Sequence, residues 1–167
     1  MMFNLSNSLS ILRLPLAFLF LSQNNSLRVI AVVLAMFTDS IDGYIARRSK
    51  SASRFGAILD PAMDKFFVYF ALVVLFLESR LDLWQVLAMI SRDFFLLIFW
   101  FYLVAIGLIR NYEYQSIRWG KASTALQFVV LIGICTSITF PPSIFMIFVL
   151  FGLLAFVELF LRLRTSS

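Results

Sequence analysis

Histidine is absent from the 167-residue sequence, and cysteine occurs once, as Cys135 in an apolar run. The first absence excludes a histidine-ligated metal and every mechanism with a histidine base or nucleophile. A single cysteine excludes an intrachain disulfide, and its position in an apolar run indicates no redox role. Without histidine, and with one cysteine, the side chains left to bind a metal ion are chiefly carboxylates.

Charge is also scarce, and apolar residues take its place. The chain is 62% hydrophobic, contains 20 phenylalanines and has a mean hydropathy of +0.95. A soluble domain would be nearer ~45–50% apolar. We therefore predict an all-α, polytopic integral membrane protein, with residues 1–167 forming one domain. The net charge of +5 is attributed to membrane topology, and no nucleic-acid partner is expected.

Apolar runs separated by polar turns predict six transmembrane helices in one bundle. The first run is shorter than the ~20 residues that a helix needs to cross a bilayer, and it is interrupted by Arg13 and Pro15. The expected spans are Leu9–Leu21, Leu27–Arg48, Phe55–Leu77, Leu83–Leu108, Gly120–Ile138 and a last helix from Pro141 or Ser143 to Leu161.

The basic residues predict the orientation of these spans. If the N-terminus lies inside, the outer loops carry only Arg28 and Arg80. This asymmetry obeys the positive-inside rule, so both termini are expected on the cytoplasmic side. The inner loops and tail would carry Arg47, Arg48, Lys50, Arg54, Arg110, Arg118, Lys121, Arg162 and Arg164.

Four of the six aspartates gather between residues 39 and 64, with apolar sequence on both sides. Asp39 and Asp42 are three residues apart, and Asp60 and Asp64 are four apart, so each pair shares one face of a helix. Carboxylates from two antiparallel helices with a short link can converge on one or two Mg²⁺ or Mn²⁺ ions. Two such ions suit displacement at phosphorus. The alternatives are a cation pathway or a salt bridge inside a bundle.

The residues around these aspartates are suited to a phosphate-bearing ligand. Gly43 and Gly56 allow close approach by a ligand or by neighbouring backbone. Arg47 lies five residues after Asp42, where its guanidinium can grip a phosphate with two hydrogen bonds. No phosphate-binding glycine loop of the Walker type is present. The expected site lies in the cytoplasmic half of the membrane.

The spacing of eight residues resembles the signature of the CDP-alcohol phosphatidyltransferases, a family of six-helix membrane enzymes. The pattern is D-x2-D-G-x2-A-R-x8-G-x3-D-x3-D, and it is met at Asp39, Asp42, Gly43, Ala46, Arg47, Gly56, Asp60 and Asp64. Three further elements resemble the branch of the family that makes anionic lipids. They are Asn7-x-Leu9-Ser10-x-x-Arg13, Asp60-Pro61-x-x-Asp64-Lys65 and Gly120-Lys121-x-Ser123-Thr124-x-x-Gln127.

The resemblance implies a role for each matched position. Asp39, Asp42, Asp60 and Asp64 would hold the metal ions, and Asp64 would also be the general base. Arg92 and Lys121 resemble the basic residues that meet the acceptor's phosphate, although Arg92 beside Asp93 can also be a self-satisfied ion pair. The CDP pocket would be shaped by Asp39, Asp42, Gly43, Ala46, Arg47 and Gly56.

The resemblance also implies the reaction and its partners. CDP-diacylglycerol would donate a phosphatidyl group to an alcohol, CMP would leave, and the enzyme would be a homodimer among membrane lipids. Glycerol 3-phosphate is the first choice of acceptor. Ser91-Arg92-Asp93, with Trp100 where a second arginine is usual, instead resembles the CDP-alcohol type of cardiolipin synthase, whose acceptor is phosphatidylglycerol. From a different class, a divalent-cation transporter explains the aspartates but not Gly43, Arg47 and Gly56.

Overall fold

The computed structural model describes the backbone of residues 5–49, 54–107 and 118–165. Side chains are described for most of them, except 5–11, 39, 40, 42–49, 54–62, 64, 118, 121, 162, 164 and 165. Within the described ranges all regular structure is helical, which confirms the all-α prediction. The helices are α1 (Leu5–Phe18), η1 (Leu19–Leu21), α2 (Asn25–Ser49), α3 (Arg54–Leu77), α4 (Leu83–Ala105), α5 (Arg118–Cys135) and α6 (Pro142–Thr165).

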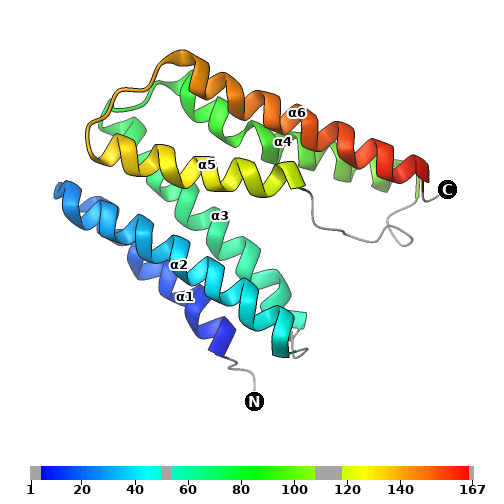
Figure 1. Cartoon of the computed structure of the whole chain (residues 1–167), viewed down its shortest axis with the longest axis horizontal. Helices are drawn as coiled ribbons and strands as arrows, with labels where there is room; N and C mark the ends of the chain where they lie inside the picture. The colour runs from blue at the N-terminus through cyan, green and yellow to red at the C-terminus, as the bar shows by residue number, and fades with distance from the viewer. Residues whose placement is uncertain (1–4, 50–53, 108–117, 166–167) are drawn as a thin grey trace. The chain divides into compact units, whose positions relative to one another are not determined.

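The chain forms two compact units (Figure 1). The first contains residues up to Leu81 together with Val130–Thr139, and the second contains Asp82–Val129 and the residues from Phe140 onward. α5 therefore contributes its first two-thirds to one unit and its last turns to the other. The prediction that residues 1–167 form one domain stays a prediction.

In the first unit α1 packs against both α2 and α3 (Figure 1). The contact faces are rich in alanine, including Ala17, Ala31, Ala35 and Ala71, all fully buried. Small side chains allow helix backbones to approach closely, as is common where apolar helices associate. Phe20 fills the remaining space, and its ring meets the Phe67 ring edge-on at 5.7 Å between centroids. Pro15, one of the two residues that interrupt the first apolar run, lies inside α1 without ending the helix.

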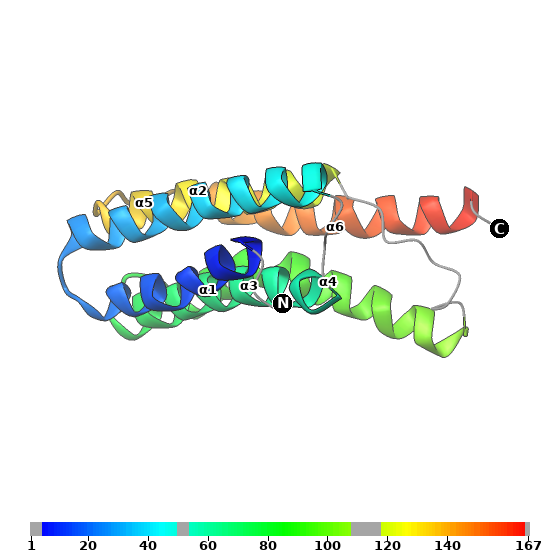
Figure 2. The same ribbon diagram turned by 90° about the horizontal axis from the view of Figure 1, so that it is seen from below.

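In the second unit α4 and α6 lie side by side and run in the same direction (Figures 1 and 2). Three ring contacts show the register, because the partners are separated by the same number of residues each time. These contacts are Trp84–Phe145, Phe95–Phe156 and Phe99–Phe160, with centroid distances of 5.4, 5.8 and 5.2 Å. A constant interval along both helices is the signature of parallel packing. Close van der Waals packing of such side chains stabilises the association of apolar helices.

The helix ends are set by local hydrogen bonds. The Ser26 N–H donates to Asn24 Oδ1 at 2.9 Å, which caps the start of α2. The chain leaves α3 at Ser79 (φ 57°) and turns after α5 at Ser137 (φ 62°), both in the left-handed region. Each turn carries the paired reverse hydrogen bonds of a Schellman motif, here with serine where glycine is usual. α5 therefore ends three residues before the predicted Ile138.

Two of the described helices are long and apolar enough to cross a membrane, Leu83–Ala105 and Pro142–Leu161. Shorter apolar stretches occur in the other helices, at Leu12–Leu21, Asn25–Thr38, Lys65–Leu77 and Ala122–Cys135. The six predicted helices are thus present at the predicted places. Their crossing of the membrane six times stays a prediction.

Candidate active site

The aspartate motif lies on the two helices that the sequence predicted. Asp39 and Asp42 belong to the second half of α2, and Asp60 and Asp64 belong to the first half of α3. Their backbone is helical, so the i, i+3 and i, i+4 spacings place each pair on one helix face. The side chains of all four lie outside the described residues. Convergence of the four carboxylates therefore stays a prediction.

The link between the two helices limits how far apart the motif can spread. Only residues 50–53 separate the end of α2 from the start of α3. A chain of that length spans at most about 17 Å even when fully extended. Gly43, Ala46 and Arg47 lie on the last turns of α2, and Gly56 lies on the first turn of α3. As with the aspartates, only the backbone of these four residues is described. The ligand-binding motif is thus confined to one helical hairpin.

The donor set of this hairpin suits a hard divalent cation. It offers four carboxylates and no thiol or imidazole, which matches the oxygen preference of Mg²⁺ and Mn²⁺. Elsewhere among the described side chains, no three carboxylates or thiols come together. The aspartates remain the candidates for metal ligands.

Arg92, the first of the two predicted acceptor-phosphate residues, lies in the middle of α4. Its Nη1 donates to the Gly120 carbonyl oxygen at 2.7 Å and to Thr124 Oγ1 at 2.6 Å, so the side chain reaches the first turns of α5. Its Nη2 lies 3.1 Å from Asp93 Oδ1, and the side chain is 14% exposed. The ion pair considered from the sequence is therefore formed, but it uses a single nitrogen of the guanidinium.

Lys121, the second acceptor-phosphate candidate, directly follows Gly120, whose carbonyl oxygen accepts a hydrogen bond from Arg92. The guanidinium contacts the Gly120 carbonyl, and Lys121 is the next residue along α5. The Lys121 side chain lies outside the described residues. The backbone nevertheless brings these two candidates, 29 residues apart in the sequence, to the same place in the second unit.

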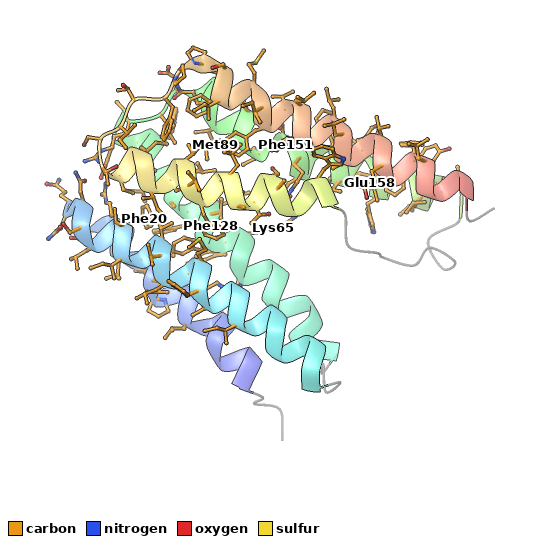
Figure 3. The ribbon with its side chains drawn as sticks, viewed as in Figure 1. Phe20, Lys65, Met89, Phe128, Phe151 and Glu158 are labelled. Atoms are coloured by element: carbon orange, nitrogen blue, oxygen red, sulfur yellow. The ribbon has the colours of Figure 1, made fainter. Side chains whose placement is uncertain are left out.

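A further contact between α4 and α5 lies one turn away. Gln127 Nε2 donates to the Met89 carbonyl oxygen at 3.2 Å, and both residues are buried; Figure 3 labels Met89. Gly120, Thr124 and Gln127 are three fixed positions of the motif that the sequence showed near residue 120. The structure gives each a contact with α4, which sequence reasoning did not assign. The signal available was their recurrence every three to four residues, which is one helix face.

A family model matches almost the whole chain. The model described as CDP-alcohol phosphatidyltransferase matches residues 3–160. The chain belongs to the CDP-alcohol phosphatidyltransferase family. The resemblance seen in eight spaced residues is confirmed, and the chain is an enzyme of this family.

Over the aligned residues, individual relatives are about one-third identical to this family member. The CDP-diacylglycerol–glycerol-3-phosphate 3-phosphatidyltransferase of Aquifex aeolicus is 31% identical over 137 residues, which cover 78% of this chain and 75% of that protein. The enzyme of the same name from Haemophilus influenzae is 35% identical, over 60% of this chain and 55% of its own. The cardiolipin synthase (CMP-forming) of Streptomyces coelicolor is 32% identical, over 61% and 46%. The match spans about half the length of the last two.

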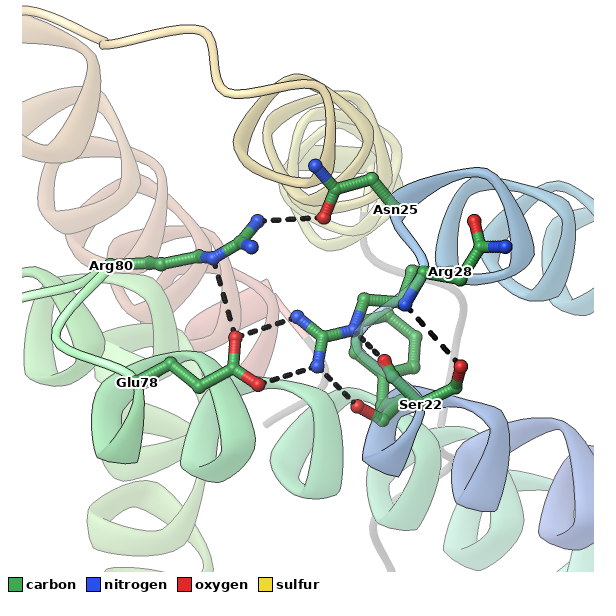
Figure 4. A network of polar contacts seen from close by, with 7 residues as sticks. Ser22, Asn25, Arg28, Glu78 and Arg80 are labelled. Atoms are coloured by element: carbon green, nitrogen blue, oxygen red, sulfur yellow. Dashed lines mark hydrogen bonds and ion pairs between the residues drawn. The ribbon is translucent and has the colours of Figure 1, made fainter.

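One polar cluster, which surrounds Glu78, was not predicted from the sequence. Glu78 follows α3 and receives both terminal nitrogens of Arg28, a fully buried residue near the start of α2 (Figure 4). Arg28 also donates to the carbonyl oxygens of Ser22 and Phe20, each at 2.7 Å. Arg80 adds a second cation 3.3 Å from Glu78. The signal was a basic residue and an acidic residue at the ends of two apolar helices.

Hydrogen bonds and charge lower the pKa of the Glu78 carboxyl. The hydrogen bonds from Arg28 are the largest cause, and the positive charges of Arg28 and Arg80 act in the same direction, while partial burial opposes them. The carboxylate is thus held ionised at neutral pH. The cluster joins the turn between η1 and α2 to the end of α3.

Proposed function

We propose that this chain transfers a phosphatidyl group from CDP-diacylglycerol to glycerol 3-phosphate, releasing CMP and giving phosphatidylglycerol phosphate. The observation that carries the proposal is the placement of the eight-residue motif on two consecutive helices, α2 and α3, with only residues 50–53 between them. The names of the Aquifex and Haemophilus relatives support glycerol 3-phosphate as the acceptor.

In this reaction the acceptor's hydroxyl oxygen attacks the phosphorus that bears diacylglycerol. A new P–O bond forms, the anhydride P–O bond breaks, and CMP leaves with the bonding electron pair. Asp64 takes the proton of the hydroxyl, a role that a carboxylate close to the site can fill. Mg²⁺ or Mn²⁺, two ions held by Asp39, Asp42, Asp60 and Asp64, would supply charge neutralisation of the diphosphate. Gly43, Ala46, Arg47 and Gly56 would shape the pocket around CDP.

The acceptor's phosphate would be bound by Arg92 and Lys121. The structure supports this assignment through the Arg92–Gly120 hydrogen bond, which places the guanidinium one residue from Lys121. Two cations suit a dianionic phosphate monoester better than one.

Cardiolipin synthesis with phosphatidylglycerol as acceptor is the second candidate. The Arg92–Asp93 ion pair favours it, because a neighbouring carboxylate reduces the positive charge offered to the acceptor. Trp100 is 44% exposed and presents an aromatic ring where a second cation is usual. A singly charged phosphodiester with acyl chains suits both features. The Streptomyces relative carries this name.

The proposed setting is the membrane. Six helices would span it, with both termini and the α2–α3 hairpin on the cytoplasmic side, and the enzyme would be a homodimer. The two long apolar helices, α4 and α6, support the membrane location. The excess of basic residues at the ends assigned to the inside supports the orientation.

The deciding experiment supplies the purified protein with CDP-diacylglycerol, Mg²⁺ and one acceptor at a time in detergent. CMP release and the lipid product are measured together. Phosphatidylglycerol phosphate as the product confirms the first choice. Cardiolipin formed only with phosphatidylglycerol replaces it with the second. Absence of CMP release with both acceptors, while metal flux is seen in vesicles, favours the transporter class.

A further inference from the structure

The Arg92 side chain is held by a hydroxyl from another helix. Thr124 Oγ1 accepts from Arg92 Nη1 at 2.6 Å and itself donates to the Gly120 carbonyl at 3.1 Å. The same carbonyl accepts from Arg92 Nη1 at 2.7 Å. The three groups therefore form a closed triangle in which the hydroxyl is satisfied as both donor and acceptor.

These contacts leave part of the guanidinium available. An arginine carries five N–H donors. Nη1 is occupied by α5 and one Nη2 proton by Asp93. Within the described part of the chain, Nε–H and the other Nη2–H make no hydrogen bond. Two donors of a side chain that is already fixed can thus be offered to an anion.

The backbone that carries Arg92 is fixed from a second side, by α6. A Cβ atom added to Gly152 would lie 3.1 Å from both the Cα and the N of Arg92, and 2.8 Å from Phe95 Cδ2. Real Cβ atoms rarely approach other atoms so closely, and backbone cannot rotate away as a side chain can. The absence of a side chain at 152 therefore allows α6 to lie directly against the peptide that carries Arg92.

We propose that Thr124 is a positioning residue for Arg92, and that it pre-orders the guanidinium for the acceptor's phosphate. The inference rests on the proposed function, which assigns that phosphate to Arg92. A free arginine side chain loses much rotamer freedom when it binds, and a side chain already held loses less. The hydroxyl therefore contributes to acceptor binding without touching the acceptor.

The test compares Thr124→Val with Thr124→Ser in the full-length enzyme, with glycerol 3-phosphate as the variable substrate. Valine keeps the shape of threonine and removes the hydroxyl, whereas serine keeps the hydroxyl. We expect Thr124→Val to raise the KM for the acceptor by about 10- to 100-fold, the range for a lost hydrogen bond to a charged group. The KM for CDP-diacylglycerol should change less than about twofold in both variants. The acceptor KM of Thr124→Ser should also stay within about twofold of the wild-type value.

Thr136→Val is the matched control. It makes the same substitution just after α5, where the hydroxyl donates only to carbonyls of its own helix, Ile132 and Gly133. An equal rise in acceptor KM in this control overturns the proposal, because the effect would then be general. A melting temperature of each variant, measured in the same detergent, reports folding.

A double-mutant cycle with Arg92→Lys separates this inference from the proposed function. If Thr124 acts only through Arg92, Thr124→Val adds less than about twofold to the acceptor KM in the Arg92→Lys background. If Arg92→Lys alone leaves the acceptor KM unchanged, the acceptor site is wrongly assigned and the inference fails with it, although CMP release would still support the family reaction. If Arg92→Lys is effective while Thr124→Val behaves as wild type, only the positioning role is overturned. Should Thr124→Val not fold, Thr124→Ala takes its place, and an acceptor KM unchanged from wild type in that variant also overturns the role.

Discussion

Arg28 and Glu78 form a two-pronged ion pair between the start of α2 and the end of α3. Nη1 lies 2.6 Å from Oε2 and Nη2 lies 2.5 Å from Oε1. The guanidinium is fully buried while the carboxylate is 29% exposed, so the arginine depends on the pair more than the glutamate does. Removal of the carboxylate would leave a buried cation whose remaining described hydrogen-bond partners are carbonyl oxygens.

We therefore predict that Glu78→Gln destabilises the protein by about 2 kcal/mol, within the range for a partly buried charged hydrogen bond. The measurement is thermal unfolding of the purified protein in detergent. Arg80→Gln is the comparison, because Arg80 is more exposed and lies 3.3 Å from the same carboxylate. It should lower stability by less than ~1 kcal/mol. Equal losses in the two variants would contradict the importance given to burial.

The same pair predicts a pH dependence. The pKa of Glu78 is lowered in the folded protein, chiefly by the hydrogen bonds from Arg28. The unfolded state then binds a proton more readily, so the pair contributes its full stability above the ordinary glutamate pKa of about 4.3. That contribution is lost as pH falls through the lower folded value. The difference in melting temperature between wild type and Glu78→Gln should be constant from pH 8 to 6 and shrink below about pH 4.3. A difference that grows with acid would reverse the sign assigned here.

Asp64→Asn tests the general base. The amide can still coordinate a metal weakly through its oxygen, but it cannot accept the proton of the acceptor's hydroxyl. We expect transfer to fall by about 10²- to 10⁴-fold, with the melting temperature little changed. CMP release at saturating metal is the measurement. A variant that keeps more than half of the wild-type rate would remove Asp64 from this role.

Asp39→Ala and Asp60→Ala test the proposed metal ligands. Each removes one carboxylate from the set, so activity should fall and the Mg²⁺ concentration for half-maximal activity should rise, by about 10-fold or more. The readout is a metal titration of the initial rate. Asp82→Asn is the control, since Asp82 lies outside the motif at the start of α4. An unchanged titration in either alanine variant would exclude that residue from the metal site.

Gly152→Ala tests the close approach of α6 to α4. The added methyl would meet the Arg92 backbone, so one helix must shift by a few tenths of an ångström. Overpacking of this kind destabilises by about 1–3 kcal/mol. We expect a lower melting temperature and a raised acceptor KM. Val157→Ala, at an exposed position of the same helix, should change both much less. Wild-type behaviour of Gly152→Ala would mean that the two helices separate at no cost.

The helices could be predicted from the sequence because apolar runs and polar turns are local signals. α2, α3 and α4 begin within two residues of their predicted starts. The ends were less predictable, since they depend on single-residue conformations. Ser137 takes a left-handed φ of 62°, a conformation that favours glycine, and the neighbouring residues do not predict it. Gly107, with φ 71°, follows the end of α4 where the prediction extended to Leu108.

The aspartate motif was also predictable, because its spacing is written along the chain. The residues that support Arg92 were not, since their contacts join positions 28 and 32 residues apart. Only a fold brings such groups within hydrogen-bond distance. The Arg28–Glu78 pair escaped prediction for the same reason, at a separation of 50 residues.

That separation also sets an order of events during synthesis. At about 5–20 residues per second, Glu78 is made roughly 3–10 s after Arg28. Throughout that interval the guanidinium lacks its counter-ion, and α1 and α2 cannot bury it as they do in the finished protein. We therefore expect α1 and α2 to keep this charge in contact with water until α3 has been translated. The Arg28 guanidinium can therefore become buried between the amino-terminal helices only when α3 is complete, and not when α2 is complete.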